Sequence, residues 1–67
     1  MSDALTIALG KEETKLKRQQ ANVESIEAAI AVLGESAKEL AKLERAKESI
    51  KETESNIRKL RAAIKKS

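Results

Sequence analysis

Cysteine, histidine, proline and all aromatic residues are missing from this sequence of 67 residues. Without cysteine and histidine, neither a disulfide nor the usual zinc and transition-metal ligand sets can be assembled. The only glycines are Gly10 and Gly34, so the sequence contains no glycine-rich phosphate-binding loop. A chain this short usually needs a disulfide, a metal or a second subunit to be stable. We therefore expect it to self-associate or to bind a partner.

The sequence also lacks a recognisable catalytic constellation. General acid–base catalysis most often uses histidine, which is absent, and no base is placed to activate the serines or lysines. Carboxylate pairs at helical spacing occur at Glu24 with Glu27 and at Glu44 with Glu48, and without histidine they fit a solvated charged face better than a metal site. We expect no enzymatic activity, no cofactor, no bound metal and no small-molecule substrate.

Long hydrophobic runs are absent as well. No apolar stretch approaches the length of a membrane span, and the N-terminus lacks the basic and apolar regions of a signal peptide. The start at Met1-Ser2 and the end at Ser67 suggest a complete small gene product. We expect a cytoplasmic protein with no membrane partner.

The residues that are present predict an all-α fold. Ala, Lys, Glu, Leu and Ile dominate, as they do in long helices and coiled coils. Gly34 suits the left-handed position that ends a helix, and Ser36 with Glu39 has the spacing of a capping box that starts one. These signals lie at the midpoint of the chain. They predict one antiparallel helical hairpin, a two-helix coiled coil spanning residues 1–67, with helices over about 3–33 and 37–65 and a turn at 34–36.

Heptad spacing of the apolar residues supports the same fold. If the chain folds back at Gly34, the predicted layers are Leu5 with Ile64, Leu9 with Leu60, Leu16 with Thr53, Val23 with Ala46, and Ile26 with Leu43. Leu33, Ile50 and Ile57 also fall on seam positions. Gly10 is a weak point, and residues before it could form a separate short helix or a mobile arm, although Leu5 and Leu9 keep the seam register and favour one continuous helix.

Polar residues interrupt the seam at Glu12, Gln19 and Thr53, all in the half away from the turn. One interpretation places them at the wet edge of the seam. The other treats them as residues that fix register or oligomeric state, as a buried Asn does in coiled coils.

Two outer surfaces are predicted outside the seam. The second helix carries a possible polyanion-binding stripe of Lys38, Arg45, Lys51, Arg58, Lys59, Lys65 and Lys66. A low-polarity stripe along the first helix and across the turn, a candidate for oligomer or partner contacts, comprises Ile7, Ala21, Ser25, Ala28, Val32, Ala37, Leu40 and Ala41. Lys-rich faces are often only solvated, and Ala is also simply a good helix former.

Three functional hypotheses follow. The leading one is a protein-interaction module that dimerises into a four-helix bundle and binds a larger protein, as an adaptor, inhibitor or assembly factor that could be phage- or plasmid-encoded. The second is a dimeric bundle that binds RNA or duplex DNA; in shape alone, without a shared motif, it resembles the RNA-binding hairpin dimer of the plasmid copy-number protein Rop. The third is a structural coiled-coil spacer. The sequence favours a homodimer, and a protein partner over nucleic acid.

Overall fold

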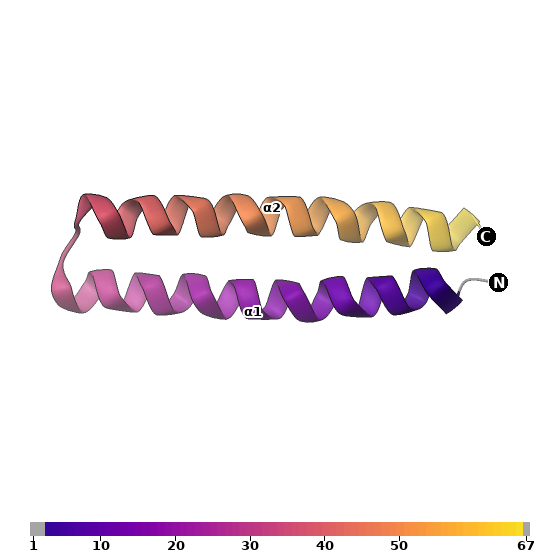
Figure 1. Ribbon diagram of the computed structural model, residues 1–67, viewed down its shortest axis with the longest axis horizontal. Coiled ribbons are helices and arrows are strands. Elements are labelled where there is room, and N and C mark those ends of the chain that lie inside the picture. The colour runs from indigo at the N-terminus through magenta and orange to yellow at the C-terminus, as the bar shows by residue number, and fades with distance from the viewer. Residues whose placement is uncertain (1–2, 67) are drawn as a thin grey trace.

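Two long helices packed side by side form the structure, a computed structural model that describes residues 3–66 (Figure 1). Helix α1 spans Asp3–Leu33 and helix α2 spans Ala37–Lys66. The molecule is a rod of 50 × 14 × 12 Å, with both chain ends at the end opposite the turn. The predicted antiparallel helical hairpin is therefore confirmed. Helix α1 continues through Gly10 without a break.

The turn is built as its residues predict. Gly34 has a φ of +89°, a conformation that L-residues with a side chain rarely adopt, and its N–H donates to the Ile30 carbonyl oxygen at 2.8 Å. Ser36 begins α2 because its Oγ accepts a hydrogen bond from the Glu39 N–H at 3.2 Å. The Ser36 carbonyl oxygen then accepts the N–H of Leu40 at 3.0 Å. One helix is thus ended and the next begun within three residues.

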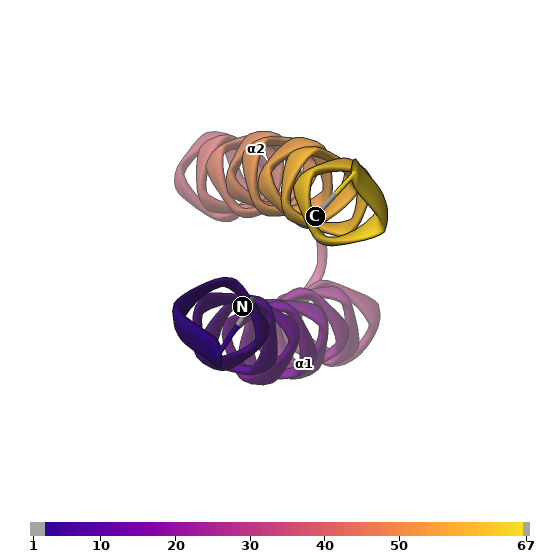
Figure 2. The same ribbon diagram turned by 90° about the vertical axis from the view of Figure 1, so that its right-hand side faces the viewer.

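The predicted seam lies between the two helices, which run antiparallel with a slight twist (Figure 2). All ten side chains of the five predicted layers are at least partly covered. Full burial is rare: among residues 3–66 only Thr53, 1% exposed, and Ile57, 5% exposed, are buried. Two helices alone leave most seam side chains open on their flanks. Ile50, for example, is only half-buried.

Leu33 corrects the seam prediction, because its side chain is 83% exposed. The register that pairs Leu16 with Thr53 would place Leu33 opposite Ser36. Ser36 caps α2 and carries no apolar side chain, so nothing in the turn covers Leu33.

The polar seam residues are less exposed than a wet edge would make them. Thr53 is the most buried side chain described, and its hydroxyl donates to the Ser49 carbonyl oxygen at 3.0 Å. Asn56 Nδ2 donates across the seam to Glu12 Oε1 at 3.0 Å. Gln19 buries its Oε1 with no hydrogen-bond partner in the part of the chain that the structure describes. The cross-helix hydrogen bond favours a role in fixing the register for Glu12, whereas Thr53 and Gln19 make no such bond among the described residues.

Neither described helix is long and apolar enough to cross a membrane.

Candidate nucleic-acid interface

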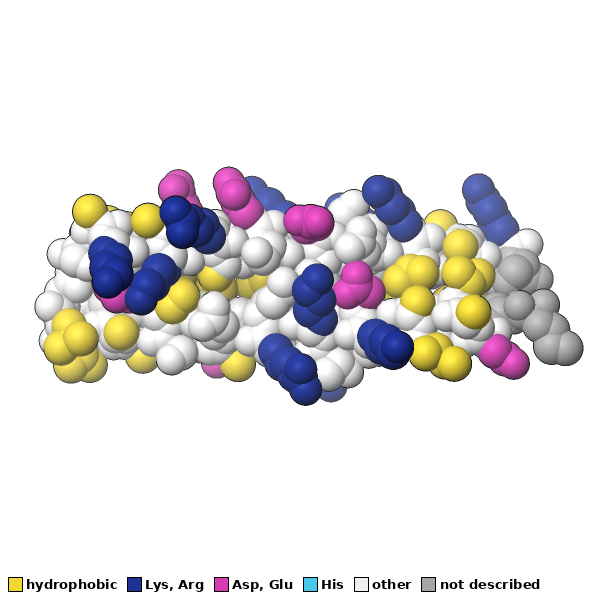
Figure 3. All heavy atoms as spheres, in the orientation of Figure 1, with side chains coloured by type: hydrophobic (Ala, Val, Ile, Leu, Met, Phe, Trp, Pro, Cys, Tyr) yellow, Lys and Arg dark blue, Asp and Glu magenta, His cyan; other side chains and the backbone are white. Residues whose placement is uncertain are grey.

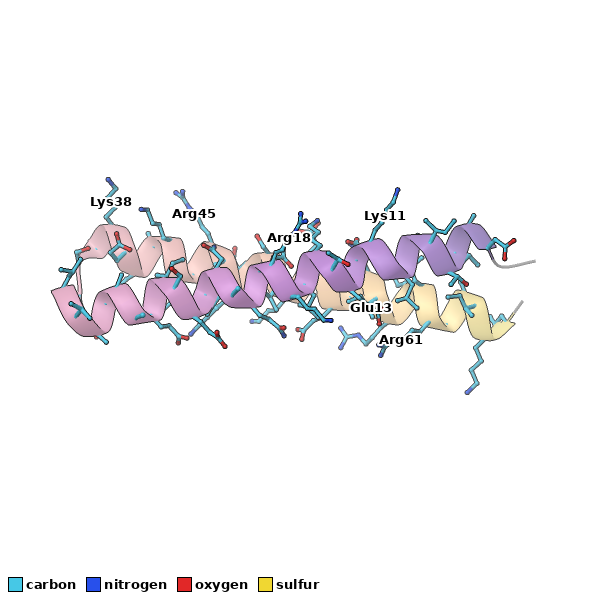
Figure 4. The ribbon with its side chains drawn as sticks, turned by 90° about the horizontal axis from the view of Figure 1, so that it is seen from below. Lys11, Glu13, Arg18, Lys38, Arg45 and Arg61 are labelled. Atoms are coloured by element: carbon cyan, nitrogen blue, oxygen red, sulfur yellow. The ribbon has the colours of Figure 1, made fainter. Side chains whose placement is uncertain are left out.

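One flank of the hairpin gathers positive charge from both helices. Lys11 and Arg18 of α1 and Lys38 and Arg45 of α2 all project from the same edge of the rod (Figure 4). Lys15 lines a hollow with Lys11 and Arg18, and Lys42 lines the interhelical groove with Arg45. We call this surface the basic flank; within residues 3–66 its eight cations are Lys11, Lys15, Arg18, Lys38, Lys42, Arg45, Lys59 and Lys66.

The last two members follow from contact and spacing. Lys59 lines a hollow with Lys11 where α1 and α2 meet, and Lys66 lies seven residues after Lys59 and therefore on the same side of α2. Dark-blue side chains from both helices are spread along this face in Figure 3. The helix rise of about 1.5 Å per residue distributes the eight cations over roughly 40 Å of the rod.

These cations are solvent-facing and almost unneutralised. All eight side chains are exposed. In residues 3–66 only Lys42 among them forms an ion pair, with Glu39 at 3.7 Å, and Glu52 is the single carboxylate on the same flank outside the seam. A linear array of cations without internal partners attracts a polyanion, because each contact with the polyanion releases a condensed counterion.

The opposite flank has a different composition, and we call it the neutral flank. Glu13 and Arg61 project from this edge and form a cross-helix ion pair at 3.1 Å (Figure 4). Residues seven apart lie on the same side of a helix, so the flank can be followed in steps of seven from the residues that line its groove. Its described charges are six acids (Asp3, Glu13, Glu24, Glu27, Glu44, Glu54) and six bases (Lys17, Lys47, Lys51, Arg58, Arg61, Lys65). The two flanks therefore differ in character although they belong to the same two helices.

The predicted basic stripe of α2 is divided between these flanks. Lys38, Arg45, Lys59 and Lys66 lie on the basic flank. Lys51, Arg58 and Lys65 lie on the neutral flank, where Arg58 lines a groove with Glu13, Glu54 and Arg61. The seven residues do not form one surface.

Sequence reasoning missed four members of the basic flank, namely Lys11, Lys15, Arg18 and Lys42. Heptad positions contained a usable signal. In an antiparallel pair, the residues beside the seam on one side of the first helix meet the residues at the same heptad position of the second helix. The α1 cations could therefore have been assigned to the side of Lys42 and Arg45. The outer face of either helix, taken alone, does not show this.

The predicted low-polarity surface is also distributed over separate places. All eight of its side chains are exposed. Ala37, Leu40 and Ala41 line a shallow hollow of α2, whereas Ser25 lines the groove on the basic flank and Ile7 lines a hollow beside Lys11. Val32, seven residues after Ser25, shares its side of α1. Leu40 and Val32 consequently lie on opposite flanks.

Comparisons with protein-family models, with curated proteins and with solved structures find no match for this chain. Within the described residues, no three Asp or Glu side chains converge as a metal-binding group would require. The shape and charge of the hairpin itself are therefore the features that indicate its function.

Proposed function

We infer that this protein binds the phosphate backbone of double-stranded nucleic acid through its basic flank. The observation that carries the proposal is the segregation of charge over residues 3–66. One flank has eight exposed cations against Glu52 and the two seam carboxylates Glu12 and Glu39 that line its hollows, whereas the other flank has six charges of each sign. Random scatter of solvated lysines along two helices would charge both flanks alike. A straight array of about 40 Å matches roughly 12 base pairs of duplex at 3.4 Å per pair.

The chemistry of the flank restricts how it binds. The chain has no aromatic side chain on which unpaired bases could stack, which disfavours single strands. Lys and Arg side chains on an exposed surface contact phosphates more readily than base edges. Binding should therefore be largely independent of sequence. If half of the eight cations contact phosphates, log K should fall with log salt with a slope of about −3.6.

The test is a matched pair of charge-neutralised variants, titrated with a labelled duplex at several salt concentrations. The basic-flank variant carries Lys11→Gln, Arg45→Gln and Lys59→Gln, and the control carries Lys51→Gln, Arg58→Gln and Lys65→Gln. Each variant removes two lysines and one arginine, all exposed and without a described ion pair. We expect the basic-flank variant to lose at least tenfold in affinity at low salt and to flatten the salt slope by up to about 3.

Measured per hairpin, with duplex in excess so that self-association does not enter the affinity, the control variant should bind almost as the parent protein does. Equal losses in the two variants would show that only net charge matters and would refute the assignment to one flank. Absence of duplex binding by the parent protein at low salt would refute the proposed function altogether.

Binding of a larger protein stays a prediction. What supports it is exposed apolar surface, with Val32 82% exposed and Leu40 42% exposed, in addition to Leu33 and Ile7. Figure 3 shows hydrophobic side chains at the turn end of both helices. Scattered exposed apolar residues are normal on proteins, so this support is weaker than the charge segregation.

A further inference from the structure

The acids and bases of the neutral flank are unequally distributed between its two helices, although their charges cancel in total. On this flank α1 contributes four acids and one base within the described residues, a balance of −3, from Asp3, Glu13, Glu24, Glu27 and Lys17. Helix α2 contributes two acids and five bases, a balance of +3, from Glu44, Glu54, Lys47, Lys51, Arg58, Arg61 and Lys65. A surface with one acidic and one basic row is complementary to itself when turned by half a revolution about the long axis.

Between these rows the flank carries apolar side chains, of which Leu40 is exposed, Leu16 and Leu43 are partly covered and Ile57 is buried. Leu16 and Ile57 line a groove whose other sides are formed by Glu13, Lys17 and Arg58. Towards the turn, Leu40 and Leu43 line a second hollow of the same flank. An apolar strip with charged margins is the usual arrangement of a helix-bundle interface.

The exposed area of the hairpin leaves room for such an interface. The chain of 7.3 kDa exposes 5273 Å². A compact monomer of that mass would expose about 4,200 Å². The excess of roughly 1,000 Å² exceeds the approximately 800 Å² that each partner buries in a standard interface. The elongated hairpin therefore has enough surplus surface for a second copy to cover.

We propose that a second copy of this chain packs on the neutral flank, with α1 of one copy against α2 of the other, to form an antiparallel four-helix bundle. The α1 row of balance −3 then faces the partner's α2 row of balance +3, and in the seam register the opposite charges meet in the open half, where Asp3 and Glu13 lie level with the partner's Lys65 and the partner's Arg58. All neighbouring helices run antiparallel, so their dipoles also attract. Packing through the basic flanks instead would oppose eight cations to eight cations, and electrostatic repulsion disfavours it.

The arrangement has a functional consequence that rests on the proposed duplex binding. Copies joined by their neutral flanks turn their basic flanks outward on opposite sides of the bundle. The dimer then presents two parallel, identical phosphate-binding surfaces. It would bridge two duplexes, whereas a monomer would only coat one.

The first experiment measures solution mass by light scattering with refractive-index detection, since the chain has no Trp or Tyr. The parent protein should have twice the mass of 7.3 kDa. Leu40→Glu, on the neutral flank, should give a monomer, and Val32→Glu, the same kind of change on the other flank, should remain dimeric. A monomeric parent protein, or dissociation by Val32→Glu with retention by Leu40→Glu, would overturn the proposal.

Charge exchange tests the pairing of rows. Asp3→Lys with Glu13→Lys should weaken the dimer at least tenfold at low salt, and Arg58→Glu with Lys65→Glu should do the same. Combining all four changes restores the complementarity and should restore dimerisation. The control Glu48→Lys with Glu52→Lys adds as much positive charge away from the neutral flank and should leave the dimer intact. Failure of the combined variant to recover, with helicity retained, would refute the pairing of α1 with α2.

Bridging is tested by capture of a second labelled duplex on an immobilised one. The parent protein should capture it, and the Leu40→Glu monomer should bind the immobilised duplex without capturing the second. If the parent protein is a dimer but binds no duplex, the proposed function fails while the interface stands. If it binds duplex as a monomer, the interface fails while the proposed function stands.

Discussion

The half of the hairpin next to the turn and the half at its open end are held together differently. In the open half, residues 3–19 and 50–66, a hydrogen bond and an ion pair cross between the helices, and both buried side chains lie there. In the turn half, residues 20–49, no described side-chain hydrogen bond or ion pair crosses the seam, and Val32 and Leu33 are more than 80% exposed. The chain connection already holds the helices together near the turn, whereas the open ends need contacts to avoid fraying.

The largest effect in this comparison is expected from truncating one large apolar side chain in each half. Ile57→Ala should destabilise the protein by about 3 kcal/mol, because Ile57 is only 5% exposed and its loss leaves a cavity. Leu33→Ala should change stability by less than about 0.5 kcal/mol. The measurement is unfolding followed by far-UV circular dichroism at one protein concentration, since association would shift the midpoint. Equal losses of stability in the two variants would contradict the difference between the two halves.

The polar seam of the open half provides the next test. Gln19→Leu should stabilise the protein by about 1–2 kcal/mol, because it removes a buried carbonyl oxygen that has no described partner. Asn22→Leu, at an exposed position of the same helix, is the control and should gain only a few tenths of a kcal/mol from helix propensity. If Gln19→Leu destabilised the protein in the same unfolding assay, its side chain would have a role that the seam geometry does not show.

The smallest expected effect belongs to the turn. Ser36→Ala should cost about 1 kcal/mol, because it removes the Oγ that accepts the Glu39 N–H. Glu35→Ala, in the same turn and without a described hydrogen bond, should be nearly neutral. Chemical denaturation of both variants measures the difference. A loss for Glu35→Ala as large as that for Ser36→Ala would show that the cap is not what begins α2.

Much of the fold was predictable because its signals are local. Gly34 and Ser36 place the turn through backbone conformation and capping, and heptad spacing then sets the layers on either side. Leu33 was wrongly assigned to the seam. Heptad spacing in the first helix does not show that α2 begins only at Ala37, so that no α2 side chain faces Leu33. Thr53 follows the opposite pattern: its polarity suggested a wet edge, yet its position between the helices buries it.

The candidate site was predicted only in part. The cations of α2 were recognised, but Lys51 and Arg58 were grouped with Lys38 and Arg45, from which the structure separates them. The cations of α1 were not included. Each helix taken alone shows which residues point away from the seam, and it does not show which of them join residues of the other helix on one surface.

By itself, then, the sequence determined two helices, the turn that joins them and the register of their seam, because capping, glycine conformation and heptad spacing act within one helix or across one turn. Only the tertiary structure decided that Lys11 and Arg18 lie on the same flank as Lys38 and Arg45, and that Val32 and Leu40 lie on opposite flanks. Those relations depend on how one helix is rotated against another, and that rotation is set by packing between residues far apart in the chain.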